Sequence, residues 1–211
     1  APYVEEVSMT TNGVLLEKYA EDLREAGLRR VNISLHSLDP LVFKKITGSD
    51  ALSDVQRGIR AAVECKLEPV KLNMVVLNGL NELEIPRLID FSKDHGAILQ
   101  LIEFQPIQAG SETYWQSSHY DLKSSEDRLE AESLKVHVRE FQRRKQYYLR
   151  DGAVVEVVRP MHNTGFCRYC TRLRVTPDGK LKPCLMRNDN LVGVLPLLRQ
   201  NASTDALAKA L

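Results

Sequence analysis

The sequence predicts an α/β protein in which a parallel sheet is followed by a small α+β unit. Three observations support this prediction. Strand-like and helix-like segments alternate over residues 1–106, the alternation ends near residue 107, and three of the four cysteines lie between residues 165 and 185. Repeated strand–helix–strand order implies right-handed crossovers, which align the strands in parallel.

The first half of the chain contains four short segments with strand-like composition. They are residues 4–10, 31–36, 70–77 and 98–104. Between them, apolar residues recur with the spacing of helices. The expected helices are residues 14–27, 40–46, 52–66 and 81–95. Gly27 suits the left-handed conformation of a C-cap at the end of the first helix.

The second half departs from this alternation. A polar loop that contains Trp115 precedes a charged helical stretch at about 120–135. Residues 138–149 and 153–160 then indicate two antiparallel strands. Residues 175–182 (VTPDGKLK) indicate a tight hairpin, because Pro-Asp-Gly favours a turn.

Four parallel strands cannot close a barrel, which usually has eight strands and about 250 residues. We therefore expect residues 1–106 to form a partial (incomplete) TIM-like βα barrel and residues 107–211 to form a small C-terminal α+β domain. Because the chain begins directly on a strand whose outer edge needs cover, we expect it to be the later part of a larger protein. The C-terminal ALAKAL is expected to be cut short as well.

One face of each expected parallel strand is polar when alternate residues are taken together. The polar residues are Ser8, Thr10, Asn32, Ser34, His36, Lys71, Asn73, Glu103 and Gln105. Both faces of a parallel sheet are normally buried, so these side chains require partners. A hydrogen-bonded core network or an incompletely covered sheet could supply them, but a polar ligand in the concavity of the sheet explains all four strands.

Composition excludes several classes of protein. With 29 basic and 28 acidic residues, the chain has no general attraction for nucleic acid or membrane surfaces. No apolar run approaches the roughly 20 residues of a membrane span, and the start resembles no signal or transit peptide. Four cysteines do not suggest a secreted disulfide framework, and Cys65 lies among apolar neighbours. We expect a cytoplasmic protein without nucleic-acid or membrane partners.

The spacing of Cys167, Cys170 and Cys184 predicts a metal site, because the hairpin returns the third cysteine toward the other two. A structural zinc site would need a fourth ligand, for which His162 is the near candidate. A redox pair could use two cysteines but leaves Cys184 unexplained. An iron–sulfur cluster with three thiolates would leave one iron open to a non-protein ligand. Spacing alone favours zinc and an iron–sulfur cluster about equally. Because the cluster of three contains no fourth cysteine, and structural zinc sites have all four ligands from the protein, the open iron–sulfur site is favoured.

Basic residues near these cysteines indicate the kind of ligand. Arg172 and Arg174 are two residues apart, so an extended backbone places them on one face, where two guanidinium groups suit a phosphate-bearing ligand. Exposed arginines without a partner are the alternative. Lys71 belongs to the polar row of the sheet, where a lysine is costly without an anion.

Five segments together carry a resemblance to a known family. They are TTNG at 10–13, VNISLHSLD at 31–39, VKLNMVVLNGLN at 70–81, LIEFQP at 101–106 and FCRYCTRLRVTPDGKLKPCL at 166–185. The set closely resembles the GTP 3′,8-cyclase family of molybdenum cofactor biosynthesis. These radical S-adenosylmethionine enzymes are lyases that convert GTP to (8S)-3′,8-cyclo-7,8-dihydroguanosine 5′-triphosphate. The resemblance implies an incomplete barrel and a second iron–sulfur cluster in the C-terminal domain.

The resemblance also implies roles for individual residues, although it assigns no catalytic residue. The residues implied to hold the second [4Fe-4S] cluster, whose open iron would meet the guanine of GTP, are Cys167, Cys170 and Cys184. Those implied to contact GTP are Thr10, Lys71, Arg172, Leu173 and Arg174. Those implied to contact S-adenosylmethionine are Ser34 and Gln105.

The family's N-terminal Cys-x3-Cys-x2-Cys motif and the glycine-rich S-adenosylmethionine motif after it have no counterpart in this sequence. The first cluster supplies the electron that cleaves S-adenosylmethionine to a radical. We therefore expect the isolated chain to be inactive and to need the missing N-terminal segment or a full-length counterpart, together with an electron donor. The resemblance is also compatible with a homodimer.

Two residues depart from the family pattern. Gln105 stands where some members use methionine toward S-adenosylmethionine, and Gln100 stands where some place a GTP-binding arginine. His36 is given no role. Two alternatives remain: another radical S-adenosylmethionine enzyme with an auxiliary cluster, such as a peptide-modifying one, and a non-enzymatic zinc-stabilised binding module. The arginine pair and Lys71 favour a phosphorylated substrate over a peptide.

Overall fold

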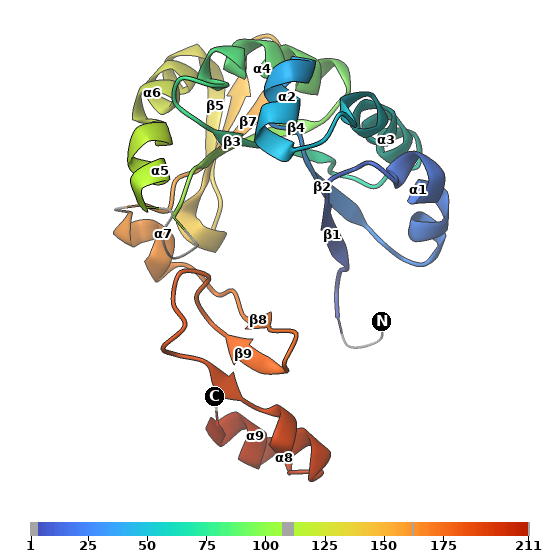
Figure 1. Cartoon of the computed structure of the whole chain (residues 1–211), viewed down its shortest axis with the longest axis vertical. Coiled ribbons are helices and arrows are strands. Elements are labelled where there is room, and N and C mark those ends of the chain that lie inside the picture. Colours follow the sequence, from blue (N-terminus) through green and yellow to red (C-terminus); the bar gives the residue numbers. More distant parts are fainter. Residues whose placement is uncertain (1–3, 107–111, 162, 211) are drawn as a thin grey trace.

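The computed structural model describes residues 4–106, 112–161 and 163–210 of the 211-residue chain. It is an arch of strands with helices on its outer side, and a smaller unit lies below the open side of the arch (Figure 1). The arch is one seven-stranded sheet in the order β1-β2-β3-β4-β7-β6-β5. Within the described ranges, no helix is both long and apolar enough to cross a membrane.

Five neighbouring strands of this sheet run parallel. In sheet order they are β1 (Ser8–Thr11), β2 (Arg30–Ser34), β3 (Lys71–Val76), β4 (Ile98–Glu103) and β7 (Val154–Val158). The first four confirm the predicted parallel strands, and their open, curved arrangement is that of an incomplete βα barrel. Because β7 pairs with β4, the sheet continues across residues 106 and 107, and a domain division at that point stays a prediction.

Two antiparallel strands complete the sheet. β6 (Lys145–Leu149) pairs with β7 and confirms the predicted antiparallel pairing, but the strand predicted over residues 138–149 begins only at Lys145, because the preceding loop contains a 3₁₀ turn at Phe141–Arg143. β5 (Ser133–Val138) pairs with β6 at the far edge. The charged helix expected at about 120–135 is α6 (Lys123–Glu132). It ends earlier than predicted because the chain enters β5 at Ser133.

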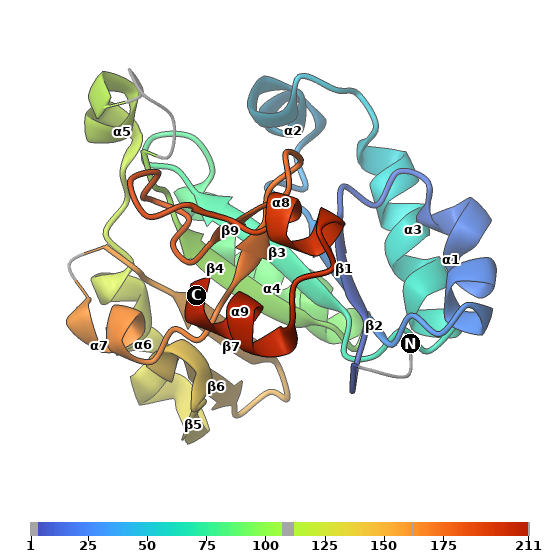
Figure 2. The same ribbon diagram turned by 90° about the horizontal axis from the view of Figure 1, so that it is seen from below.

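Helices cover the outer face of the parallel strands (Figures 1 and 2). They are α1 (Leu16–Glu25), α2 (Pro40–Thr47), α3 (Leu52–Glu64) and α4 (Ile85–Asp94), the last preceded by a 3₁₀ turn at Glu82–Glu84. The sequence determines the ends of α2 directly. The Asp39 carboxylate accepts hydrogen bonds from the N–H groups of Leu41 and Val42, and Gly48 ends the helix in the left-handed conformation at φ 73°.

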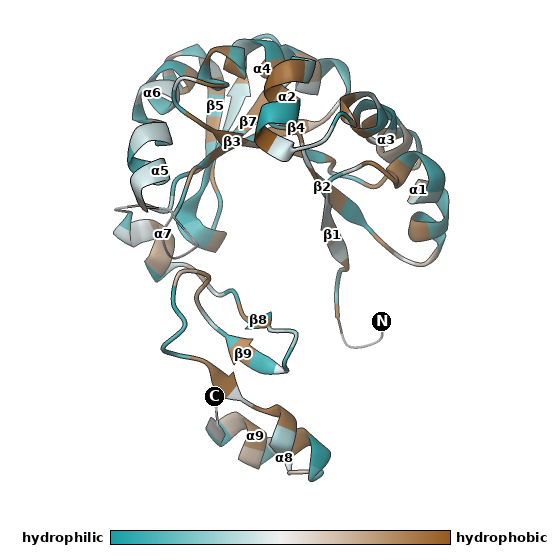
Figure 3. Ribbon diagram, viewed as in Figure 1, coloured by the Kyte–Doolittle hydropathy of each residue, from teal (hydrophilic) through white to brown (hydrophobic). Residues whose placement is uncertain are grey.

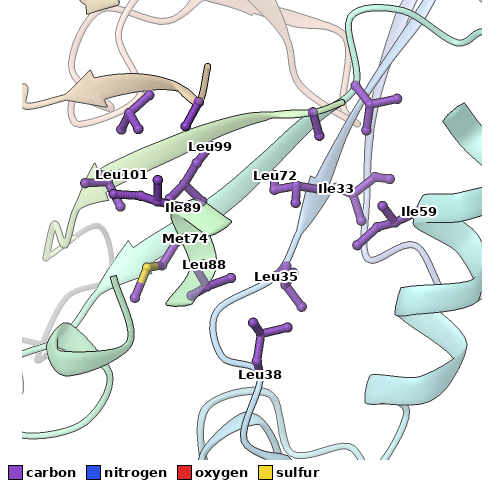
Figure 4. Close-up of a cluster of buried hydrophobic side chains, with 14 of the residues drawn as sticks. Ile33, Leu35, Leu38, Ile59, Leu72, Met74, Leu88, Ile89, Leu99 and Leu101 are labelled. Carbon is purple, nitrogen blue, oxygen red and sulfur yellow. The ribbon is translucent and has the colours of Figure 1, made fainter. Parts of the chain in front are cut away.

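The core lies between this face and the helices (Figure 4). The fully buried residues contributed by the strands include Ile33, Leu72, Met74, Leu99 and Leu101. Ile59 of α3 and Leu88 of α4 pack against them. The helices carry both hydrophilic and hydrophobic residues, as expected for amphipathic helices on a sheet (Figure 3). Full burial of each such side chain stabilises the fold by about 1.5–3 kcal/mol.

The smaller unit is a three-stranded antiparallel sheet in the order β10-β9-β8. Its strands are β8 (Arg174–Val175), β9 (Lys180–Lys182) and β10 (Val192–Gly193). The turn between β8 and β9 confirms the predicted hairpin: Gly179 adopts φ 76°, and the Lys180 N–H donates to Thr176 Oγ1 at 2.9 Å. Four further helices in the described residues do not belong to the layer that covers the parallel strands. They are α5 (Glu112–Ser118), α7 (Thr164–Arg168), α8 (Leu195–Arg199) and α9 (Thr204–Ala210).

Candidate functional site

The register of the sheet aligns polar side chains into two rows on its concave face. The first row runs across β1, β2 and β3 and consists of Thr10, Asn32 and Lys71. The second row crosses β2, β3, β4, β7 and β6 and consists of Ser34, Asn73, Gln100, Glu156 and Gln146. Directly paired residues point to the same face. The polar face predicted for β1, β2 and β3 is therefore confirmed.

The prediction for β4 is wrong by one residue. Glu103 shares its face with Leu101 on the helix-covered side, whereas Gln100 occupies the polar row. Glu103 is buried there, and its carboxylate accepts from the Met161 N–H at 2.8 Å and lies 3.0 Å from His119 Nε2. A shift of one residue exchanges the two faces of a strand, so the strand's polar residue on the concave face is the glutamine.

Glu156 is the centre of a charged cluster that sequence reasoning missed. Its side chain is fully buried. Lys71 Nζ lies 2.6 Å from Oε2, and Arg144 Nη1 lies 2.8 Å from Oε1. Arg139 Nη1 lies 3.3 Å from Oε2. The side-chain amides that also donate to this carboxylate, at 2.8 and 2.9 Å, are those of Gln100 and Gln146.

The charges of this cluster do not balance, because three cationic side chains surround one carboxylate. Burial by itself would raise the pKa of the Glu156 carboxyl, but Lys71 and Arg144 outweigh that effect and hold its pKa below the usual range. The pKa values of Lys71 and Arg144 are lowered, because burial and neighbouring guanidinium groups disfavour their charged forms more than one carboxylate favours them.

One signal in the sequence could have identified Glu156. It is the single charged residue in the otherwise apolar strand AVVEVV at 153–158. A lone carboxylate in a parallel strand requires buried partners. The identity of Arg139 and Arg144 as those partners depends on the fold of the 139–144 loop, for which the sequence carried no comparable signal.

An aromatic ring connects this cluster to the cysteine segment. The Arg144 guanidinium carbon lies 5.1 Å from the centre of the Phe141 ring, and that of Arg172 lies 5.2 Å from the same ring. Both distances are within the range of cation–π contact. Lys71 and Arg172, predicted from distant parts of the sequence to contact one ligand, are thus linked through Arg144.

Of the three predicted metal-binding cysteines, Cys167 and Cys170 lie in the segment that leads from the main sheet to the small unit, and Cys184 lies within the small unit, between β9 and β10. All are free thiols; Cys167 is exposed on α7, and Cys170 and Cys184 are half-buried. Among the described residues, no group of three or more His, Cys, Asp or Glu side chains is placed to hold a metal ion. The shared site therefore stays a prediction, and His162, its alternative fourth ligand, lies outside the described residues.

The surroundings of Cys170 nevertheless suit a metal thiolate. Gln142 Nε2 donates to Cys170 Sγ at 3.3 Å. Burial would raise the pKa of this thiol, but the backbone N–H of Arg172, the Gln142 amide and the positive charges of Arg172 and Arg174 together lower it. A thiol that ionises readily is the form that ligates iron or zinc, so the donor chemistry fits the predicted group.

The other predicted contacts lie at two places. Thr10 and Ser34 lie near the carboxyl ends of β1 and β2, and Gln105 follows the carboxyl end of β4 half-buried. The carboxyl ends of parallel strands are where α/β sheets usually bind ligands. Leu173 is 52% exposed, and Arg174 Nη1 donates to the Pro183 carbonyl oxygen at 3.3 Å. Their contacts with a ligand stay predictions.

Comparison with known proteins gives two family matches. Residues 2–92 match the Radical SAM superfamily, and residues 97–211 match the family described as Molybdenum Cofactor Synthesis C. A domain of a pyruvate-formate lyase-activating enzyme from Bacteroides vulgatus ATCC 8482 aligns with 51% of this chain and 70% of its own, with a TM-score of 0.40 and 20% identity. That likeness is too distant to support a conclusion.

Curated relatives are much more similar. A protein named "Probable GTP 3′,8-cyclase" from Thermococcus kodakarensis is 48% identical over 99% of this chain and 69% of its own length. Its namesake from Methanococcus aeolicus is 48% identical over 93% of this chain and 64% of its own length. The protein of the same name from Methanosarcina mazei is 51% identical over 92% of this chain and 58% of its own length. The chain thus spans between 58% and 69% of the length of these relatives.

Proposed function

The chain belongs to the GTP 3′,8-cyclase family, and from that premise we propose that it is the substrate-binding part of an enzyme that converts GTP to (8S)-3′,8-cyclo-7,8-dihydroguanosine 5′-triphosphate in molybdenum cofactor biosynthesis. The observation that carries the proposal is the pair of polar rows on the concave face, with buried Lys71 in the first. Glu156 supplies one carboxylate to Lys71, Arg139 and Arg144, and the phosphates of a nucleoside triphosphate would balance the remaining positive charge.

The chain's own residues divide the work of binding. Lys71, Arg172 and Arg174 would neutralise the phosphates, Thr10 would hydrogen-bond the nucleotide from the end of β1, and Leu173 would contact it beside the arginines. Cys167, Cys170 and Cys184 would hold the second [4Fe-4S] cluster. Ser34 and Gln105, at the carboxyl ends of their strands, would contact S-adenosylmethionine. Binding both molecules across one concave face would place the ribose beside the radical source.

The groups that the chain would bind supply chemistry that its side chains lack. When bound, S-adenosylmethionine would supply the radical that removes a hydrogen atom from the ribose, and the cluster would supply an open iron for the guanine. Free cysteines of this kind persist in a reducing compartment, which fits a cytoplasmic enzyme. We further propose that the isolated chain is inactive and needs a complementing N-terminal segment and an electron donor.

The proposal is tested by anaerobic reconstitution of the chain with iron and sulfide. About four irons and four sulfides per chain, with an electron paramagnetic resonance signal that changes on addition of GTP but not ATP, would support it. Cys184→Ser should lose the cluster, whereas Cys65→Ser, the matched control, should retain it. One zinc per chain, no sulfide and no response to GTP would contradict it.

Activity is tested by complementation. The reconstituted chain is mixed with the N-terminal segment of the Thermococcus kodakarensis relative, S-adenosylmethionine, GTP and a reductant, and the cyclised product is measured. Product in the mixture and none from either piece alone is expected. Turnover by the chain alone would contradict the requirement for the second piece.

A further inference from the structure

We propose that Arg139 and Arg144 bind the phosphates of the nucleotide together with Lys71, and that Glu156 is the positioning residue that holds the three cations toward one point. The inference rests on the proposed function and adds to it two contacts from the 139–144 loop. It starts from the cluster around Glu156, in which Lys71 is 4% exposed and Arg144 is 10% exposed in their side chains.

The first argument is charge. Three cations and one carboxylate leave an excess of positive charge in a buried place. Buried charge is costly unless it is paired, and the cost grows when like charges are close together. An anion with two or more negative charges would balance the cluster, and a polyphosphate carries that charge.

The second argument is an unused hydrogen-bond donor. Within the described part of the chain, Arg144 Nε is buried and has no hydrogen-bond partner. Two other basic residues nearby have carboxylate partners: Arg159 Nη1 lies 2.7 Å from Glu126 Oε2, and Lys145 Nζ lies 2.9 Å from Glu130 Oε2. Buried donors are rarely left without a partner, and an orphaned one indicates a missing ligand or water. A phosphate oxygen is a suitable acceptor for it.

The third argument is position. Arg144 contacts the carboxylate that holds Lys71, and it lies against the same Phe141 ring as Arg172. Lys71 and Arg172 are both proposed contacts of GTP, so the guanidinium of Arg144 lies between two groups that would bind the same molecule. Arg139 is the most exposed of the three cations, with 27% of its side chain accessible to solvent.

The experiment is calorimetric binding to the reconstituted full chain, with inorganic tripolyphosphate, GTP, ATP and guanosine as probes. Arg144→Gln and Arg139→Gln are compared with Lys145→Gln, a control that removes a neighbouring charge paired with Glu130 on the surface. We expect Arg144→Gln to lower the affinity for tripolyphosphate and for GTP by about tenfold or more, because charge-assisted hydrogen bonds to the phosphates are lost. The affinity of Arg144→Gln for guanosine should equal that of the unaltered chain. The control, Lys145→Gln, should bind all four probes with unchanged affinity.

Arg139→Gln is expected to lower the affinity for the same two ligands by a smaller factor. Because Arg139 is more exposed than Arg144, its variant should still fold, and the test can proceed if Arg144→Gln does not fold. Unchanged tripolyphosphate affinity in the folded arginine variants, or no binding by the unaltered chain, would overturn the inference. GTP binding that persists in those variants would leave the proposed function standing. Binding of tripolyphosphate that depends on both arginines, without preference for GTP over ATP, would instead support the inference and count against the proposed function.

Discussion

The two faces of the parallel sheet are built from alternate residues of the same strands, yet they differ completely. On the convex face Ile33, Leu72 and Leu99 are fully buried beneath the helices. On the concave face, Lys71 and Glu156 are as well buried but charged. The strands therefore separate two tasks between neighbouring positions: one set of side chains specifies the fold, and the other set carries chemistry.

Energetics explain why the second set is not there for stability. Each buried apolar side chain contributes about 1.5–3 kcal/mol. A buried ion cluster gains little over apolar residues of the same volume, because desolvation offsets the attraction between its charges. Once the cluster is present, however, its members depend on one another. Four predictions test this comparison, from the largest expected effect to the smallest.

Glu156→Gln should lower the free energy of unfolding by about 3–5 kcal/mol, because it leaves buried cations without their shared carboxylate. Urea denaturation measures this change. The matched control is Glu130→Gln, which removes a carboxylate from an exposed ion pair with Lys145 and should cost less than about 1 kcal/mol. Equal losses of unfolding free energy in the two variants would mean that the buried cations depend on Glu156 no more than Lys145 depends on Glu130 at the surface.

Leu72→Ala should cost about 2–5 kcal/mol on the convex face, because it creates a cavity where the side chain is fully buried. Leu41→Ala, which truncates a leucine that is 78% exposed on α2, is the control and should change stability little. Unlike substitutions in the cluster, Leu72→Ala should leave the affinity for tripolyphosphate unchanged in the folded protein. A large loss of that affinity would contradict the separation of the two faces.

The pH dependence of stability should contain a contribution from Glu156. Its pKa is lowered in the folded state, so its stabilising effect is present above the unfolded pKa of about 4.3 and is lost as the pH falls through the folded value. The difference in unfolding free energy between the unaltered chain and Glu156→Gln should therefore narrow between pH 7 and pH 3. A constant difference would show that the carboxylate charge is not what matters.

Asp39→Ala should have the smallest effect, about 1 kcal/mol, because it removes the N-cap of α2 and touches neither face of the sheet. Thermal denaturation followed by circular dichroism measures it. Asp39→Asn, which retains a side-chain oxygen as acceptor, should restore most of the stability. If the asparagine variant were as unstable as the alanine variant, capping would not be the role of this residue.

Local patterns predicted most of the first half, and long-range pairing was the part they could not reach. The four parallel strands follow from alternation and spacing within 106 residues. The fifth parallel strand, β7, pairs with β4 across the fifty residues of chain that separate the two strands, and no local pattern distinguishes a parallel from an antiparallel neighbour there. Its sequence therefore suggested only the hairpin with β6.

The candidate site was predictable where one residue carried the signal alone. Lys71 was identified because a lysine in a polar row is costly without an anion. Gln100 and Glu103 lie three residues apart on one strand and so face opposite sides, and only pairing with β3 decides which of them belongs to the concave face. For the cysteines, spacing indicates a shared site but does not place the three sulfur atoms.

The loop between β5 and β6 has a consequence for how this chain tolerates change in length. Gln142 is buried with φ 58°; its N–H donates to the Tyr169 carbonyl oxygen at 2.9 Å, and its amide donates to Cys170 Sγ. Surface loops usually accept insertions. An insertion here would displace Arg139 or Arg144 from the sheet and loosen the cysteine segment in the same step, so this short connection is a poor site for a tag, a graft or a circular break.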